Sequence, residues 1–325
     1  MVLALALFAL GILLIVKGGD WFVDAAGWLA EISGIPPVII GATVVSLATT
    51  IPELLVSVLA ATQGKVAMAV GNAVGSVNAN IGLIMALSII WAPGLFARRQ
   101  LGIKAFLMVA ACLLLLALSA DGALSAVGSA VLLALFLIFV VENIRSAKLC
   151  LAEKTAAEYG SAPSSGDKNS VGGNLLKFFL GAAAIVVGAR LLVDNGSALA
   201  LCLGVSEAVI GVTMVAVGTS LPELVTTVSA LVKRQAELSI GNIIGANIID
   251  LTMILPVCAM FSEGTLPVCR QSVILDMPMT VVLVLLAALP PFICGRFRRS
   301  QGLLILLAYI AYMFLVTTGS SLIFI

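Results

Sequence analysis

Runs of about 20 apolar residues, the length that crosses a bilayer as a helix, recur along almost the whole chain. The runs show no alternation of polar and apolar positions, which the strands of a membrane barrel would require. Because backbone polar groups in lipid must be paired within the segment, the pattern predicts transmembrane α-helices. Ten are expected, at residues 1–30, 37–62, 66–92, 101–119, 123–142, 174–201, 208–232, 237–261, 271–293 and 301–323.

The composition supports lipid as the solvent, since 62% of the 325 residues are hydrophobic and only 10% are charged. The chain contains no His, which excludes imidazole metal sites and His-assisted nucleophiles. Its six Cys are scattered without a CxxC spacing, so reduced, unreactive thiols are expected. No nucleophile and base are paired in the sequence. We therefore expect neither an enzyme nor a bound cofactor, and any chemistry must use oxygen ligands.

The only long polar stretch lies at residues 145–173 and contains SAPSSGDKNSVGG. Its composition predicts a flexible cytoplasmic linker. The linker divides the chain into two halves of five predicted helices each, residues 1–144 and residues 174–325.

The distribution of Lys and Arg predicts the orientation, because cytoplasmic loops carry an excess of both. If both termini lie outside the cytoplasm, the loops on the extracytoplasmic side hold only Lys65 and Arg270. The cytoplasmic loops then hold Arg98, Arg99, Lys104, Arg145, Lys148, Lys154, Lys168, Lys177, Lys233, Arg234, Arg296, Arg298 and Arg299. We expect a multi-pass protein of the inner (cytoplasmic) membrane with both termini on the extracytoplasmic side.

The two halves repeat each other at a shift of 170 positions, so that residue 41 aligns with residue 211. GATVVSLATTIPELLVSVLA (41–60) aligns with GVTMVAVGTSLPELVTTVSA (211–230), and GNAVGSVNANIGLI (71–84) aligns with GNIIGANIIDLTMI (241–254). Five predicted helices separate equivalent points, and an odd number reverses the direction through the membrane. Inverted repeats of this kind are typical of secondary transporters, whose substrate site lies near the middle of the bilayer.

Each repeat contains two hydroxyl residues, an apolar residue, Pro and then Glu inside an apolar segment. Pro52 and Pro222 lack a backbone N–H, so each helix is expected to break or unwind just before Glu53 or Glu223. Freed carbonyl, hydroxyl and carboxylate oxygens are the ligands that hard cations such as Ca2+ require. An ionisable residue in mid-membrane is unfavourable by several kcal/mol and indicates an ion pathway.

The helix after each Glu-bearing segment contains a second polar motif. Ser76 and Asn80 lie four residues apart and therefore share one helical face, and they align with Ala246 and Asp250. Because it aligns with Asn80, we interpret Asp250 as a ligand. Asp24 and Asp194 are interpreted as structural residues near helix ends. The Gly and Asn residues of the second motif are interpreted as positions where helix backbones pack closely, namely Gly71, Asn72, Gly75, Gly241, Asn242 and Gly245.

These motifs closely resemble the two alpha repeats of the cation/Ca2+ exchanger superfamily, specifically its prokaryotic sodium/calcium antiporters. The repeats of that family read approximately GxTxxAxGTSxPE followed by GNxxGSNxxN/D. The resemblance implies an all-α membrane protein with ten transmembrane helices in two inverted five-helix repeats, the sodium/calcium exchanger fold. The corresponding alpha-1 and alpha-2 motifs are residues 41–84 and 211–254.

The resemblance also implies the ligands. Glu53 and Glu223 would be the central ligands shared by Ca2+ and Na+. Flanking cation sites would use Thr49, Thr50, Thr219 and Ser220 with carbonyls around Ser46 and Ala216, and the cage would be completed by Ser76, Asn80 and Asp250.

Departures from the family pattern include Ala48, Thr50, Val77 and Ala246. Ala246 stands where the family has a Ser hydroxyl that helps to hold one Na+, which leaves the Na+ to Ca2+ ratio open.

The expected function is secondary active exchange of Ca2+ for Na+ by alternating access. An antiporter of the same fold that couples Ca2+ or another cation to H+ or K+ remains an alternative, and a passive cation channel is a third. The expected partners are the two ions and the lipid bilayer, without nucleic acid. A monomer is expected, and an oligomer is left open.

Overall fold

A computed structural model of the chain describes residues 2–94, 98–157, 171–202, 218, 220–262 and 264–319. Within these residues nine helical spans are long and apolar enough to cross a membrane. They are Val2–Ser33, Pro37–Thr62, Val66–Trp91, Leu101–Leu118, Ala126–Ala152, Val171–Leu199, Ala236–Met260, Ser272–Cys294 and Arg299–Thr318. A shorter apolar helix, Leu221–Val232, is the described part of the expected helix 208–232. The all-helical membrane architecture predicted from the apolar runs is therefore confirmed.

The chain divides into two compact units, and the boundaries fall inside helices α3 (Ser46–Thr62), α7 (Ala126–Ala157) and α12 (Ala236–Ile249). The first unit is Met1–Thr49 with Val140–Asn242, and the second is Thr50–Phe139 with Ile243–Ile325. Each unit thus takes segments from both predicted halves. The halves are defined by sequence similarity rather than by compactness, so the division at the linker stays a prediction about the repeat.

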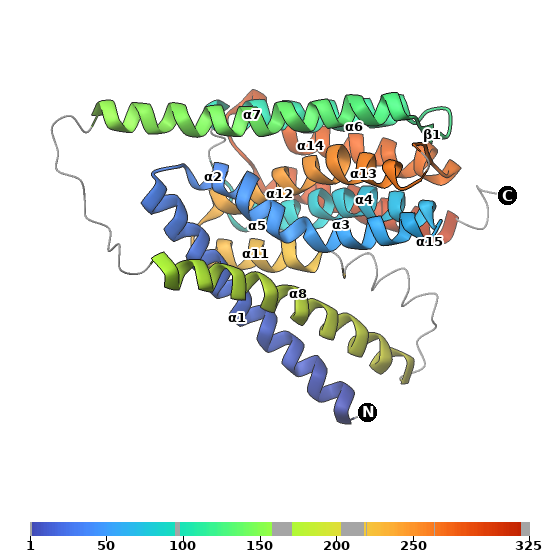
Figure 1. The fold of residues 1–325 in the computed structure, drawn as a ribbon, viewed down its shortest axis with the longest axis horizontal. Coiled ribbons are helices and arrows are strands. Elements are labelled where there is room, and N and C mark those ends of the chain that lie inside the picture. Colours follow the sequence, from blue (N-terminus) through green and yellow to red (C-terminus); the bar gives the residue numbers. More distant parts are fainter. Residues whose placement is uncertain are drawn as a thin grey trace. The chain divides into compact units, whose positions relative to one another are not determined.

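The first unit is built around two long helices that lie side by side, α1 and α8 (Figure 1). Small residues bring their backbones together: a Cβ on Gly18 would lie 2.9 Å from the carbonyl oxygen of Gly181. The unit contains α1 (Val2–Ser33), α2 (Pro37–Ile40), the π-helical η1 (Gly41–Val45), the start of α3 (Ser46–Thr62), the end of α7 (Ala126–Ala157), α8 (Val171–Cys202), α11 (Leu221–Val232) and the start of α12 (Ala236–Ile249).

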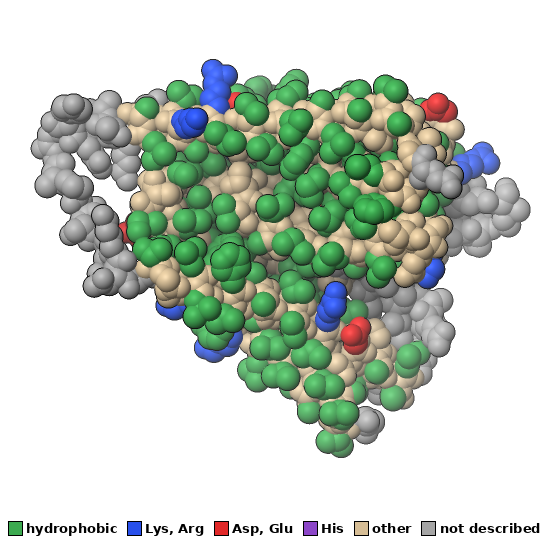
Figure 2. Space-filling model, viewed as in Figure 1, with side chains coloured by type: hydrophobic (Ala, Val, Ile, Leu, Met, Phe, Trp, Pro, Cys, Tyr) green, Lys and Arg blue, Asp and Glu red, His purple; other side chains and the backbone are tan. Residues whose placement is uncertain are grey.

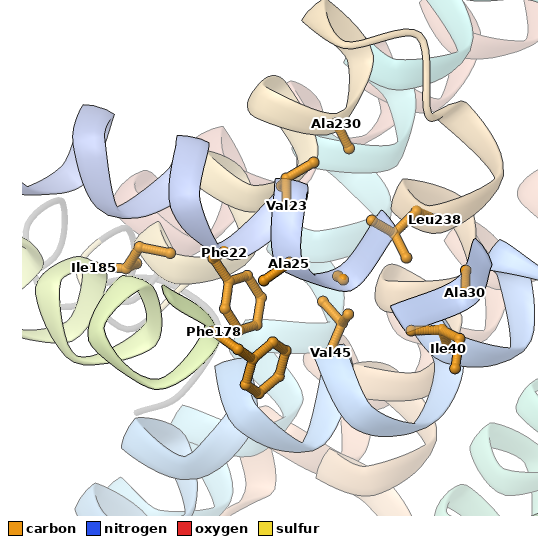
Figure 3. Close-up of a cluster of buried hydrophobic side chains, with 11 residues drawn as sticks. Phe22, Val23, Ala25, Ala30, Ile40, Val45, Phe178, Ile185, Ala230 and Leu238 are labelled. Carbon is orange, nitrogen blue, oxygen red and sulfur yellow. The ribbon is translucent and has the colours of Figure 1, made fainter. Parts of the chain in front are cut away.

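An apolar cluster fills the space between these helices (Figure 3). The rings of Phe22 from α1 and Phe178 from α8 pack with centroids 4.6 Å apart and an interplanar angle of 32°. Ile40, Ala230 and Leu238 extend the cluster to α2, α11 and α12. This packing fixes the two motif-bearing helices of the unit, α11 and α12, against α1.

The second unit packs α14 against α6, and α15 against α5 and η2. Its two short strands, β1 (Ala123–Leu124) and β2 (Leu266–Pro267), pair antiparallel, with Leu124 opposite Leu266. The helical elements are the remainder of α3, α4 (Val66–Ala79), η2 (Asn80–Met85), α5 (Ala86–Trp91), α6 (Arg98–Leu118), the start of α7, the end of α12, η5 (Asp250–Ile254), α13 (Leu255–Met260), η6 (Ser272–Asp276), α14 (Met277–Cys294) and α15 (Arg299–Gly319).

The sequence repeat recurs in local backbone structure. The π-helical segments η2 and η5 begin at Asn80 and Asp250, which are equivalent positions of the repeat. The turns before α4 and α12 also match, since Gly64 has φ 73° and its counterpart Arg234 has φ 59°. Non-Gly residues rarely adopt this left-handed conformation. The equivalence of the two repeats therefore extends from sequence to backbone geometry.

The predicted effect of the prolines is wrong in the first repeat. Helix α3 continues from Ser46 to Thr62 with Pro52 inside it, so it does not break just before Glu53. Where a proline frees one carbonyl, neighbouring groups in a membrane protein can satisfy it without ending the helix. In the second repeat α11 begins at Leu221 with Pro222 in its first turn, which agrees with a new helix start immediately before Glu223.

Two smaller expectations also need correction. Helix α7 continues to Ala157, well past its predicted end at residue 142 and into the predicted linker. Lys104 does not lie in a loop, because it is a fully buried residue of α6.

The visible face of the molecule is covered mainly by hydrophobic side chains with few charged ones, as a lipid-facing surface requires (Figure 2).

Candidate functional site

The described residues that the sequence predicts as ligands are all buried. Glu53, Glu223 and Asp250 are each only 1% exposed, although they stand in otherwise apolar segments. Ser46, Thr49, Thr50, Ser76, Asn80 and Ser220 are also buried. Thr219 and Ala216 lie outside the described residues. Burying a carboxylate in an apolar environment is strongly unfavourable without a compensating charge, so these three acids require an explanation.

In the first unit, a chain of hydrogen bonds connects the hydroxyl motif of the first repeat to the Glu of the second. The hydroxyl of Thr49 contacts the backbone carbonyl of Ser46 at 3.3 Å and the Oδ1 of Asn242 at 3.2 Å. Asn242 donates from Nδ2 to the hydroxyl of Thr226 at 3.0 Å, and Thr226 donates to the backbone carbonyl of Glu223 at 3.0 Å. Asn242 is thus the junction between α3, α11 and α12.

In the second unit, Asn72 holds the backbone of the other Glu-bearing helix. Its Nδ2 donates to the carbonyl oxygen of Glu53 at 3.3 Å and to the hydroxyl of Ser57 at 2.9 Å. Asn72 and Asn242 are equivalent in the repeat. Each therefore ties the helix that follows the Glu to the helix that carries it.

These two amide ties were missed by the sequence interpretation, which assigned both Asn residues to helix packing. Their hydroxyl partners, Ser57 and Thr226, were not singled out either. The available signal was the recurrence of Asn at the same position in both repeats, since a buried amide needs several hydrogen-bond partners.

The segment from Ser76 to Asn80 presents oxygen atoms that are buried and lack a hydrogen-bond partner among the described residues. They are the Oγ of Ser76 and the Oδ1 of Asn80. The Nδ2 of Asn80 donates to the Oδ1 of Asn247 at 3.1 Å, which leaves the Asn80 oxygen for another donor or a cation. The Oγ of Ser220 in the first unit is likewise buried without a described partner.

Asn80 and Asp250 both begin a π-helical segment. Such segments alter the direction of the side chains and carbonyls around them and occur frequently at functional sites. Ala246, which departs from the family pattern, is fully buried one turn before Asp250, and its side chain supplies no oxygen.

The acidic residues divide into buried and exposed groups. Asp24 forms an ion pair with Lys233, with Oδ1 and Nζ 2.7 Å apart, and its side chain is 59% exposed. The ion pair supports a structural role for Asp24, but the residue lies within α1 and not near a helix end as expected. Within the described residues, no three Asp, Glu, His or Cys side chains lie close enough together to hold a metal ion. Hydroxyl, amide and carbonyl oxygens would therefore have to complete any cation site.

Comparison with known proteins identifies the family. The family model described as sodium/calcium exchanger protein matches residues 3–145 and 174–318. An uncharacterized membrane protein of Methanocaldococcus jannaschii is 33% identical over 313 residues, covering 95% of this chain and 97% of the relative. The sodium/calcium exchanger MaX1 of Methanosarcina acetivorans is 28% identical over 336 residues, covering 94% and 95% of the two chains.

A solved structure of the sodium-calcium exchanger NCX_Mj, soaked with Na+ and Sr2+, superimposes with a TM-score of 0.82. Its sequence is 32% identical, and the match covers 98% of this chain and 99% of the other. The fold is therefore the sodium/calcium exchanger fold that the alpha motifs implied. This multi-pass chain belongs to the sodium/calcium exchanger family of membrane transporters.

Proposed function

We propose that this chain is a secondary active antiporter that exchanges Ca2+ for Na+ by alternating access, with Glu53 and Glu223 as the carboxylate ligands of the transported cation. The observation that carries the proposal is the burial of both Glu residues at equivalent positions of two repeats, each 1% exposed. Family membership and the likeness to NCX_Mj support it.

The coupling follows from charge. Two ionised carboxylates in a desolvated site are unfavourable by themselves, and one Ca2+ neutralises both. Na+ carries half that charge, so more than one Na+ is needed to occupy the same oxygens and displace Ca2+. States in which the carboxylates are neutralised cross the middle of the membrane more readily than the empty charged state. That difference links the flow of one ion to the flow of the other.

Neutral oxygen ligands complete the proposed site. Thr49, Thr50, Thr219 and Ser220, with carbonyls around Ser46 and Ala216, would hold flanking cations. Ser76, Asn80 and Asp250 would complete the cage around the central site, with no more than two carboxylates on any one cation. The buried oxygens of Ser76, Asn80 and Ser220, which have no hydrogen-bond partner in the described part of the chain, support this assignment. Hard cations bind such sets of carboxylate, amide and hydroxyl oxygens.

We propose the inner (cytoplasmic) membrane as the location, with both termini on the extracytoplasmic side and the linker at residues 145–173 in the cytoplasm. The excess of Lys and Arg in the loops on that side supports the orientation. Lys104, which is buried in α6, does not contribute to this excess. A monomer contains both repeats and both Glu residues, which is sufficient for the proposed mechanism.

Ion flux in proteoliposomes tests the proposal. Vesicles loaded with Na+ are diluted into a medium that contains radiolabelled Ca2+. The main cation of this external medium is K+, choline or Na+ in three parallel experiments. Uptake that requires an outward Na+ gradient, and that stops when Na+ is equal on both sides, is the expected result. If an outward H+ or K+ gradient drives the same Ca2+ uptake in the absence of Na+, that ion is the coupled ion in place of Na+. Ca2+ uptake without any counter-ion would show that the protein is a channel.

A further inference from the structure

Asp276 is a buried acidic residue of the second unit that the proposed cation site does not use. It is 8% exposed and ends the π-helical segment η6 at the start of the span Ser272–Cys294. Both of its carboxylate oxygens accept hydrogen bonds at 3.0 Å, Oδ1 from the hydroxyl of Tyr312 and Oδ2 from the hydroxyl of Ser272. Asp276 therefore connects η6 to α15 through its side chain.

The backbone of Asp276 is connected to the helix that carries Ser76 and Asn80. Asn78 of α4 donates from Nδ2 to the carbonyl oxygen of Asp276 at 3.2 Å. Its Oδ1 accepts a hydrogen bond from the hydroxyl of Thr280 at 2.7 Å. Asn78 is 1% exposed, and both ends of its amide are thus bonded to the η6–α14 segment.

Asn78 lies two residues from both Ser76 and Asn80, so its side chain leaves α4 on nearly the opposite side. We call the polar cluster of Asp276, Asn78, Tyr312, Thr280 and Ser272 the brace. The brace thus contacts α4 on the side opposite its proposed ligand face. A helix face that must hold cation ligands in fixed geometry needs such support, because small displacements of ligands weaken binding.

Helix α15 also contacts the segment directly. The ring of Tyr309 packs on Gly82, two residues beyond Asn80 in η2, and a Cβ at Gly82 would collide with it. The rings of Tyr309 and Tyr312 lie with centroids 6.2 Å apart. Tyr309 therefore supports η2 just after Asn80 in the sequence. Tyr312, through Asp276, supports Asn78 just before it.

We propose that Asp276 is a positioning residue, which through the brace fixes the segment from Ser76 to Asn80 and so sets the affinity for the transported cation. The inference rests on the proposed function, since it takes Ser76 and Asn80 as ligands. The second repeat has Ile248 at the position of Asn78, so it has no amide there to form a second brace.

The test measures the Ca2+ concentration for half-maximal uptake and the maximal rate separately for each variant. Tyr312→Phe removes only the hydroxyl, and Asp276→Asn keeps the shape but leaves one hydroxyl donor without an acceptor. Each should raise the half-maximal Ca2+ concentration about five- to tenfold, the equivalent of one lost buried hydrogen bond, with the maximal rate within about twofold. The double variant should shift about as far as either single variant, because without the Tyr312 hydroxyl the one remaining amide oxygen can accept from Ser272.

Gln301→Leu is the matched control. Gln301 is 7% exposed, and its Nε2 donates to the carbonyls of Leu286 and Ala287, both at 3.0 Å. These bonds tie α15 to α14 and do not involve α4. It should lower thermal stability in detergent as much as Tyr312→Phe does but leave the half-maximal Ca2+ concentration unchanged. Equal shifts in all three variants, or no shift in Tyr312→Phe, overturn the proposal, because the cluster would then serve stability alone.

Stabilisation of the purified protein by Ca2+ and Na+ in thermal unfolding separates this inference from the proposed function. If the wild type is stabilised by these cations but does not exchange them, the exchange function fails, and the same variants are compared by their cation-dependent shifts in Tm. If the wild type neither exchanges the cations nor is stabilised by them, both proposals are overturned.

Discussion

The two repeats carry the same motif but place it on different local structures. In the first repeat Pro52 lies inside a continuous helix, whereas in the second Pro222 lies in the first turn of α11. The amide ties, the turn before the next helix and the π-helical segment at Asn80 or Asp250 recur in both. The amide ties, the turn and the π-helical segment are therefore more alike in the two repeats than the helical structure that immediately precedes each Glu.

The side chains on this framework differ in charge and in oxygen content. The first repeat has the neutral Asn80 where the second has Asp250, and it has the hydroxyl of Ser76 where the second has Ala246. The first repeat is thus richer in proposed neutral ligands, and the second contains the additional acidic residue. An exchanger that must bind ions of two different charges can use such a division of ligands, and substitutions that make the repeats alike test it.

Replacing either Glu should have the largest effect. Glu53→Gln and Glu223→Gln each remove one of two proposed charged ligands while keeping the size of the side chain. Loss of an interaction worth about 3 kcal/mol predicts at least a 100-fold fall in Na+-driven Ca2+ uptake for each. The measurement is uptake in proteoliposomes, with the elution profile in detergent as the control for folding. Normal exchange by both variants would refute the assignment, and normal exchange by one would show that the repeats are not equivalent.

Asp250→Asn makes the second repeat like the first and should weaken Ca2+ binding about tenfold, because a carboxyl group of the cage is replaced by an amide. The exchange of both residues, Asp250→Asn with Asn80→Asp, keeps the total charge and moves it to the other repeat. We expect the exchange to restore most of the Ca2+ affinity, measured as the half-maximal concentration for uptake. Failure to restore it would show that the position of the acid matters more than its charge.

The sequence predicts most of the helices because an apolar run of membrane-spanning length is itself the signal. The expected spans 37–62 and 66–92 differ from the observed spans Pro37–Thr62 and Val66–Trp91 by at most one residue. Helix α7 extends past its predicted end because the polar residues that follow the span still support a helix outside the apolar run. Hydropathy marks where a helix leaves lipid, which is not always where it ends.

The polar details of the site are less predictable. A π-helical segment adds one residue to a turn, and in an apolar run such as IGLIM no polar position reveals the shift. The break expected at Pro52 assumed that a freed carbonyl must end the helix, which does not hold where other groups can satisfy it. The bond from Asn78 to Asp276 joins residues 198 positions apart, and no local pattern indicates such a contact.

The amide ties should differ in strength between the repeats. Asn242→Ala removes one hydrogen bond from each of the buried hydroxyls of Thr49 and Thr226 and should lower the free energy of unfolding by about 2 kcal/mol. Asn72→Ala should lower it by about 1 kcal/mol, because Asn72 is only partly buried. Unfolding in denaturing detergent, with each variant compared to the wild type, measures both values. A larger loss in Asn72→Ala would contradict the ranking taken from burial.

The two prolines should respond in opposite ways to substitution. Pro52→Ala restores a backbone N–H inside α3 and should stabilise the protein by about 1 kcal/mol, part of the roughly 3 kcal/mol that a proline disfavours an interior helical position. Pro222→Ala should change stability by less than about 0.5 kcal/mol, because a first-turn N–H has no intrahelical partner. The same unfolding measurement applies. Destabilisation by Pro52→Ala would show that the kinked or freed backbone at Pro52 is needed for packing.

The smallest effects should come from the hydroxyl that only one repeat has. Ala246→Ser restores the oxygen found in the family and should lower the half-maximal Na+ concentration for Ca2+ release about threefold, whereas Ser76→Ala should raise it by a similar factor, each corresponding to less than about 1 kcal/mol. Removal of a buried hydroxyl that has no hydrogen-bond partner among the described residues should not reduce stability, so Ser76→Ala separates ligand loss from unfolding. The Hill coefficient for Na+ is the decisive readout. If Ala246→Ser leaves both it and the Na+ affinity unchanged, Ala246 does not limit Na+ binding, and the difference between the repeats at this position has no role in the ion ratio.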